Sequence, residues 1–394
     1  MLTSLALILL CGMVLGSLFN KLRLPSLVGM IVTGVVLGPY ALNLLDDSIL
    51  MISPDLRQLA LIIILTRAGL SLDLDDLKKV GRPALLMCFV PACFEIGAIV
   101  LLAPPLLGVT YREAAIMGTV VAAVSPAVIV PRMFRLMEEG YGTARSIPQL
   151  ILAGASVDDI FVIVLFASFI QLEHGQAVSL VQIASIPISI VLGLAVGLIC
   201  GFVLSRLFRV IHMRDSVKVV ILLSVSFLLI ALEHAVAHVV AFSGLLAVMA
   251  AGAAVLQQTP AVAKRLSAKF SKLWVGAEII LFVLVGATVD IRYAAAAGGA
   301  AALVILGALV LRMLGVLVCV VKTPLAWKER VFCMLAYLPK ATVQAAIGAI
   351  PLTMGLACGQ TVLTVAVLAI VITAPLGALA IDRSYKRLLT REQV

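Results

Sequence analysis

Long apolar stretches follow one another along almost the whole chain, separated by short polar segments. A helix that crosses the hydrocarbon core of a membrane needs about 20 predominantly apolar residues. We count thirteen stretches of this kind, at residues 3–19, 26–44, 55–72, 83–106, 112–131, 146–170, 178–206, 217–236, 238–257, 274–291, 294–321, 329–354 and 360–382. With 63% hydrophobic and 12% charged residues, a soluble fold could not cover this surface. The sequence predicts an all-α polytopic membrane protein with thirteen transmembrane helices, and it shows no nucleotide-binding motif or soluble enzymatic domain.

Basic residues are distributed unevenly between the two ends of these stretches. Most Lys and Arg follow odd-numbered stretches, as Lys78 and Arg82 do, whereas only Arg57, Arg112 and Arg292 follow even-numbered ones. Cytoplasmic loops carry the excess of Lys and Arg in membrane proteins. The pattern predicts a cell-membrane protein with its N-terminus outside and its C-terminus in the cytoplasm. The net charge of +9 is thus explained by topology and does not indicate binding to nucleic acid.

Three short motifs in the first half recur in the same order in the second half. The pairs are residues 29–34 with 244–249, 68–74 with 285–291, and 125–127 with 338–340. Helices 1–6 would then pair with helices 8–13 in the opposite orientation, with helix 7 as the linker between them. Each half also has a central proline among small residues, Pro126 and Pro339, and proline interrupts a helix. The sequence therefore predicts inverted six-helix repeats with two crossed broken helices, a plan found in many secondary transporters.

Two adjacent acids, Asp158 and Asp159, lie within the apolar stretch 146–170. One Asp at the centre of a membrane helix costs about 3 kcal/mol, and such residues normally mark an ion or proton path. The alternative is a purely structural pair neutralised by a basic neighbour. One buried base cannot neutralise two acids, so the pair favours cation or proton transport.

Other charges are predicted at a similar depth. Glu95, Asp158, Arg312 and Lys340 all lie about 15–20 Å from the cytoplasmic helix ends at 1.5 Å per residue. Glu95 and Arg312 belong to repeat-related helices and could pair, and Lys340 follows the break in helix 12, where it could reach the aspartates.

A hard cation such as Na⁺ or Li⁺ needs several oxygen ligands. Ser125, Ser156 and Thr342 could add hydroxyl oxygens to those of Asp158 and Asp159. Because a protonated aspartate holds Na⁺ poorly, protons and cations would compete for the same oxygens.

The motifs ASVDD (residues 155–159), PKATVQA (339–345) and SPA (125–127) resemble those of the monovalent cation–proton antiporter superfamily, and its NHA-type sodium/hydrogen exchangers in particular. The resemblance covers nearly the whole chain. It implies that Asp159 and Asp158 bind the cation and the proton, that Lys340 is the competing counter-charge, and that Glu95 and Arg312 form a neighbouring ion pair. No cofactor is implied beyond the transported ions.

The resemblance also implies a division of labour along the chain. Transport helices would occupy residues 83–170 and 293–394, scaffold and dimerisation helices residues 1–82 and 211–292, and a linker helix residues 171–210. An elevator-like movement of the transport helices in a homodimer surrounded by lipid would follow. Paired aspartates are typical of electrogenic exchange, but bacterial electrogenic exchangers do not typically carry this Glu95–Arg312 combination, so their stoichiometry does not transfer directly.

Three other classes of membrane protein are alternatives to a sodium/hydrogen exchanger. K⁺/H⁺ exchange or K⁺ efflux is the main alternative, because selectivity depends on the size of the cavity. A sodium-coupled solute symporter shares crossed broken helices but lacks a central Asp-Asp with a buried Lys. An intramembrane aspartyl protease needs its two aspartates on different helices, whereas Asp158 and Asp159 are adjacent on one.

Overall fold

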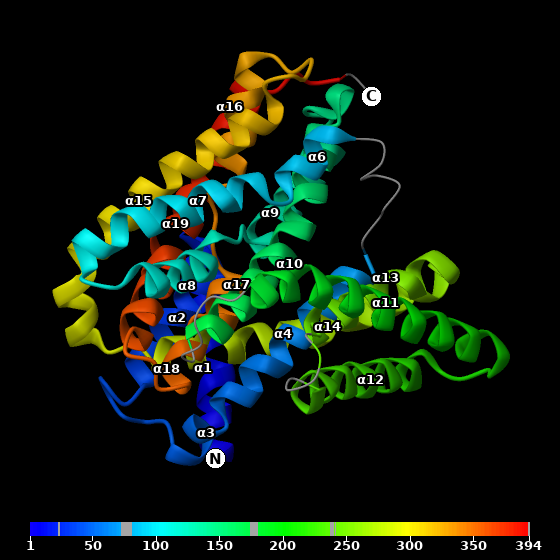
Figure 1. Ribbon diagram of the computed structural model, residues 1–394, viewed down its shortest axis with the longest axis horizontal. Helices are drawn as coiled ribbons and strands as arrows, with labels where there is room; N and C mark the ends of the chain where they lie inside the picture. The colour runs from blue at the N-terminus through cyan, green and yellow to red at the C-terminus, as the bar shows by residue number, and fades with distance from the viewer. Residues whose placement is uncertain (23, 72–80, 174–179, 237–239, 241, 393–394) are drawn as a thin grey trace. The chain divides into compact units, whose positions relative to one another are not determined.

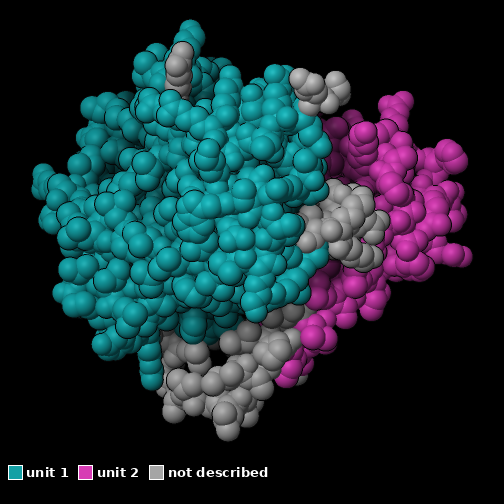
Figure 2. All heavy atoms as spheres, turned by 90° about the horizontal axis from the view of Figure 1, so that it is seen from above, with its two compact units in different colours: residues 1–54, 73–170, 281–394 teal, residues 55–72, 171–280 magenta. Residues whose placement is uncertain are grey.

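The computed structural model describes the chain except for residues 23, 72–80, 174–179, 237–239, 241 and 393–394. The side chains of some helical residues, Ser156 among them, are also outside the description. The described residues are helical almost throughout (Figure 1), and strand-type pairing among them is limited to an isolated antiparallel bridge between Tyr141 and Arg391. They fall into two compact units, which Figure 2 distinguishes by colour.

Unit 1 comprises residues 1–54, 73–170 and 281–394. Its helices are α1 (Leu2–Lys21), α2 (Ser26–Leu37), α3 (Asp47–Met51), α6 (Arg82–Met87), α7 (Val90–Leu107), α8 (Tyr111–Ala122), α9 (Pro126–Glu138), the 3₁₀ turn η1 (Thr143–Arg145), most of α10 (Ile147–Glu173), α15 (Ile291–Val320), α16 (Trp327–Ala336), α17 (Thr342–Ile347), α18 (Ile350–Thr353) and α19 (Gly359–Leu388). Within this unit α7 packs against α8 and α15, and α19 packs against α15 and α16. All the charged residues predicted at mid-depth therefore belong to one compact unit.

Unit 2 comprises residues 55–72 and 171–280. It contains most of α4 (Ser53–Gly69), α11 (Leu180–Val210), α12 (Asp215–Val236), α13 (Gly244–Gln258) and the first part of α14 (Pro260–Ala287). Helix α11 packs against α13 through Gly197 and Gly201, where a Cβ atom would lie 2.3 Å from the carbonyl oxygens of Ala247 and Ala251. Only glycine allows this approach of the two helices.

Each of the thirteen predicted stretches contains at least one described helix. Among the described residues, nine helices are long and apolar enough to cross a membrane, and three shorter apolar helices accompany them. The chain is thus a polytopic helical membrane protein, while the count of thirteen crossings and the repeat relationship stay predictions. One difference concerns the predicted stretch 274–291, because α14 already begins at Pro260 and so includes the basic residues Lys264 and Arg265. An apolar pattern cannot reveal a helix that continues as a polar segment beyond the membrane.

Both predicted helix breaks are present. Helix α8 ends at Ala122 and α9 begins at Pro126, while α16 ends at Ala336 and α17 begins at Thr342. Pro126 occupies the first position of α9, where its missing N–H costs nothing. The two breaks are joined by a backbone hydrogen bond of 2.8 Å from the Ser125 N–H to the Pro339 carbonyl.

Helix α19 holds the second break in place through a close contact at Gly377. A Cβ atom there would lie 2.4 Å from Cγ of the Pro339 ring. We expect Gly377→Ala to lower the free energy of unfolding by about 1–3 kcal/mol, because a rigid ring and its backbone must move to admit the methyl group. Thermal unfolding in detergent measures this. Gly97→Ala on α7 is the matched control, since nothing lies within 4 Å of its Cβ position; equal losses in both variants would contradict the close packing inferred here.

Candidate ion-binding site

The break between α8 and α9 exposes backbone groups that a continuous helix would satisfy, and polar side chains from other helices take their place. Gln344 Nε2 donates to the carbonyls of Val121 and Ala123, at 3.0 and 2.8 Å. The carbonyl of Ala122 accepts from Lys340 Nζ at 3.1 Å and also from the Arg312 guanidinium. Buried backbone groups need such partners, so these side chains are part of the structure of the break.

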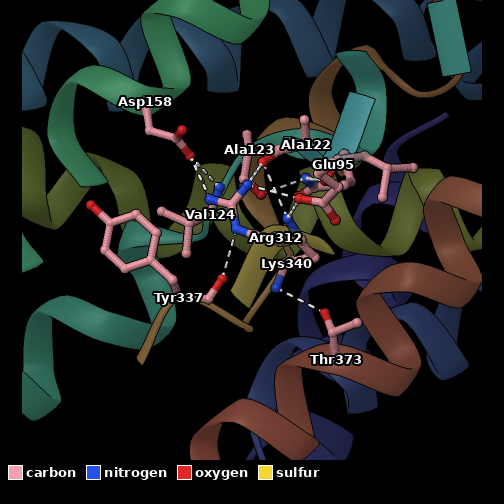
Figure 3. A network of polar contacts seen from close by, with 11 residues as sticks. Glu95, Ala122, Ala123, Val124, Asp158, Arg312, Tyr337, Lys340 and Thr373 are labelled. Carbon is pink, nitrogen blue, oxygen red and sulfur yellow. Dashed lines mark hydrogen bonds and ion pairs between the residues drawn. The ribbon is translucent and has the colours of Figure 1, made fainter. Parts of the chain in front are cut away.

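The second break is satisfied in a similar way. The carbonyl of Tyr337 accepts from Arg312 Nε at 2.9 Å, and the backbone N–H of Lys340 donates to Thr373 Oγ1 at 2.9 Å. Arg312 on α15 therefore contacts both breaks. Its side chain is completely buried, and it lies at the centre of the network in Figure 3.

The predicted ion pair between Glu95 and Arg312 is confirmed, with 2.7 Å between Arg312 Nη1 and Glu95 Oε2. Arg312 Nη2 also reaches Asp158 Oδ2 at 2.9 Å, a contact that the sequence did not predict. One guanidinium thus joins two buried carboxylates. Arg is suited to this role because its planar fork presents several donors at once.

Lys340 has a different partner from the one we expected. Its ammonium donates to Glu95 Oε2 at 2.5 Å, whereas the expectation was that Lys340 would reach the aspartates. The base that contacts Asp158 directly is Arg312. Lys340 lies within the irregular backbone segment between α16 and α17, so helical periodicity could not give the direction of its side chain.

The two adjacent aspartates have different surroundings. Asp158 is fully buried, and its Oδ2 accepts from Arg312 and from the backbone N–H of Val124 at 2.8 Å. Asp159 is less buried, and its Oδ1 has no hydrogen-bond partner among the described residues. Its charge interacts with those of Asp158, Arg312 and Lys340. Of the three carboxylates in this cluster, Asp159 is the one that forms no ion pair with a described base.

Other buried oxygens near the breaks also lack protein partners among the described residues. They include Ser125 Oγ, Thr342 Oγ1, Gln344 Oε1, the Tyr337 hydroxyl, Glu95 Oε1 and the second carboxylate oxygen of Asp158. Ser125 and Thr342 are the predicted hydroxyl ligands, and both are buried next to a break. The side chain of Ser156 lies outside the described residues. Oxygens without protein partners are the kind of ligand that a hard cation prefers.

Three functional contacts were not singled out from the sequence. Gln344 bridges carbonyls of the first break, Thr373 holds the backbone of Lys340, and Tyr337 supplies a carbonyl to Arg312. Gln344 could have been noticed as the remaining polar residue of the segment that follows Pro339. Thr373 lies in an apolar stretch with no signal that distinguishes it from a packing residue.

Comparison with known proteins shows the family of the chain. The family model described as the transmembrane sodium/hydrogen exchanger matches residues 5–383. The chain belongs to the sodium/hydrogen exchanger family. It is 32% identical to human sodium/hydrogen exchanger 9B2, over 97% of this chain and 74% of that protein. It is 31% identical to the mouse exchanger 9B2, over 97% of this chain and 73% of that protein. This exchanger is thus a membrane antiporter of monovalent cations and protons, and not an enzyme.

The fold has a close match among solved structures. The sodium proton antiporter MjNhaP1 from Methanocaldococcus jannaschii superimposes with a TM-score of 0.85 and covers 98% of both chains. Its sequence identity with the exchanger is 19%. At that identity the match establishes the shared helical fold, and the roles of individual residues depend on the contacts described above.

Substitution of Lys340 tests how charge near Asp159 controls the pH dependence of transport. We expect Lys340→Gln to shift the pH profile to more alkaline values, because removing a positive charge lets a nearby carboxylate keep its proton to higher pH. It should also lower thermal stability, since Glu95 loses a 2.5 Å contact. Proton flux in liposomes across a pH series measures the first effect. Lys322→Gln, at an exposed position after α15, is the control; an unchanged profile for Lys340→Gln would place Lys340 outside the electrostatic reach of the site.

Proposed function

We propose that this exchanger moves Na⁺ or Li⁺ in exchange for H⁺, with Asp159 as the carboxylate that binds both. The observation that carries the proposal is the contrast between the two aspartates. Asp158 Oδ2 accepts from Arg312 and from a backbone amide, which leaves only its Oδ1 unpaired. Asp159 forms no ion pair with a described base, and its Oδ1 is buried without a partner among the described residues. An unpaired buried carboxylate is unstable unless a proton or a cation neutralises it.

Competition for Asp159 gives the exchange. When Asp159 is protonated it cannot hold Na⁺ well, and when Na⁺ is bound the proton has left. The hydroxyl oxygens of Ser125 and Thr342 complete the proposed cation site, together with the free oxygen of Asp158. If the transport helices reorient only when the site is neutralised, each passage carries either a cation or a proton.

The reorientation that we propose is an elevator-like movement of residues 83–170 and 293–394 against a scaffold of residues 1–82 and 211–292, linked by residues 171–210. The two broken helices support this proposal, because each supplies one proposed hydroxyl ligand, Ser125 or Thr342, and they are hydrogen-bonded to each other at Ser125 and Pro339. A homodimer in the cell membrane, with the N-terminus outside and the C-terminus in the cytoplasm, is the proposed assembly.

The charges of the site bear on stoichiometry. Arg312 and Lys340 balance Glu95 and Asp158, so Asp159 supplies the remaining negative charge among these five residues. One Na⁺ or one proton then neutralises the cluster, and one-for-one exchange would be electroneutral. Electrogenic exchange, which the paired aspartates predict, requires Asp158 or Lys340 to exchange a second proton and to break its ion pair in the cycle.

The experiment is a transport assay in proteoliposomes with an imposed pH gradient and a pH-sensitive dye inside. Na⁺, Li⁺ and K⁺ are added in turn, and the expected result is proton movement on addition of Na⁺ or Li⁺. Repeating the assay at clamped membrane potentials separates electrogenic from electroneutral exchange. A response to K⁺ alone would favour the K⁺/H⁺ alternative, and the absence of any cation-dependent proton movement would refute the proposal.

A further inference from the structure

A surface groove of about 480 Å³ lies along the C-terminal part of α19, at its contact with α16. Leu376 and Leu379 of α19 and Leu335 of α16 line its apolar part. Leu376 is 46% exposed. All three lie in unit 1, on helices that flank the second break, so the groove is separate from the charged cluster but shares its supporting helices.

Two basic residues line the same groove further toward the C-terminus. Arg383 and Arg387 are one helical turn apart on α19 and exposed, so their guanidinium groups can serve one anionic group. Neither forms an ion pair with a described carboxylate, whereas the neighbouring Asp382 is already bound by Arg132 and Arg135 at 3.2 and 2.8 Å. The groove thus carries positive charge that the described part of the protein does not neutralise.

A third polar group points to a ligand independently of the arginines. The hydroxyl oxygen of Ser384, which also lines the groove, is buried and has no hydrogen-bond partner among the described residues. A serine in a helix commonly satisfies its hydroxyl on the carbonyl four residues earlier, as Ser168 does with Val164 at 2.8 Å. Ser384 thus adds to the lining of the groove a hydroxyl that no described acceptor satisfies, and such a donor suits a phosphate oxygen.

We propose that this groove binds an anionic phospholipid of the leaflet at the C-terminal end of α19. The phosphate contacts Arg383, Arg387 and the Ser384 hydroxyl, and an acyl chain lies along the leucines. Basic pockets between membrane helices at a membrane surface bind anionic headgroups in this way. The order of the residues along α19 matches a lipid, because Leu376 and Leu379 precede Arg383 and Arg387 toward the middle of the helix, and Leu388 alone follows them.

The groove lies on the same two helices that hold the second break. Thr373 and Gly377 of α19 contact the backbone of Lys340 and the ring of Pro339, and α16 leads directly into that break. A lipid wedged between α16 and α19 therefore stabilises the packing on which the position of Lys340 depends. Lipid binding should raise the thermal stability of the exchanger as well as occupy the groove.

The test measures lipid binding directly, and so does not depend on transport. Purified full-length protein in neutral detergent is titrated with phosphatidylglycerol or with phosphatidylcholine, and bound lipid is counted by native mass spectrometry while Tm is recorded. We expect phosphatidylglycerol to bind and raise Tm, and phosphatidylcholine to do neither. Each basic residue near an anionic surface contributes about 1 kcal/mol, so Arg383→Gln with Arg387→Gln should weaken binding about 30-fold.

The control for loss of charge is Lys386→Gln, which lies on the same turn of α19 but does not line the groove. It should bind phosphatidylglycerol like the unmodified protein. A second variant, Ala380→Phe, fills the groove without removing charge and should also reduce binding. Equal binding of the two lipids, or unchanged affinity in the double arginine variant, would overturn the proposal. Glycerol phosphate alone should not raise Tm, and an equal effect of that probe would replace the lipid by a simple phosphate site.

Discussion

Asp159→Asn is expected to abolish cation-dependent proton movement in proteoliposomes while leaving the protein folded. The asparagine keeps the size of the side chain but can neither carry a proton at this position nor offer a negative charge to Na⁺. Because Asp159 Oδ1 has no partner among the described residues, its neutralisation removes an unpaired buried charge. We therefore expect the Tm of this variant to stay unchanged or to rise.

Asp158→Asn provides the sharpest comparison, because it is the same substitution one residue away. The substitution removes the ion pair between residue 158 and Arg312, so the variant should have a lower Tm as well as impaired transport. Asp47→Asn, at an exposed position in the first turn of α3, should affect neither property. Near-normal exchange by a well-folded Asp159→Asn protein would remove Asp159 from the centre of the mechanism, whatever the result for Asp158.

The sequence predicted the parts of this site that depend on position along a helix. Apolar length located the helices, and Pro126 and Pro339 located the two breaks. Equal depth on two stretches that the predicted repeat pairs was sufficient to predict the contact of Glu95 with Arg312, because both residues lie on regular helices whose rise per residue is known.

What the sequence could not give was the direction of side chains around the breaks. Lys340 lies within the irregular segment of the second break, so its contact with Glu95 depends on backbone angles that no periodic pattern contains. The contact of Arg312 with Asp158 depends on how α10 and α15 are rotated about their axes. Depth alone placed these charges in one layer, and only the packing of the helices determined which acid meets which base.

Arg312→Gln should be among the most destabilising single substitutions in this protein. The Arg312 side chain is fully buried and donates to Glu95, Asp158 and the carbonyl of Tyr337. Its removal strands the charge of Asp158 and leaves Glu95 with Lys340 alone. Breaking a buried ion pair by removing one partner costs about 3–5 kcal/mol. Arg292→Gln, an exposed change at the other end of α15, should cost little and is the matched control.

Glu95→Gln should also be costly, because it deprives both Arg312 and Lys340 of a carboxylate. The double variant Glu95→Gln with Arg312→Gln should cost less than the sum of the single changes, since the charge that each strands is removed by the other. A coupling energy of about 0.5–3 kcal/mol is typical of residues in one network, and unfolding measurements on the four proteins of the cycle would give it. Strict additivity would show that the two residues do not interact.

A shift in the apparent Na⁺ affinity of stable double variants is also expected, because Arg312 contacts Asp158 and so links this ion pair to the acid next to Asp159.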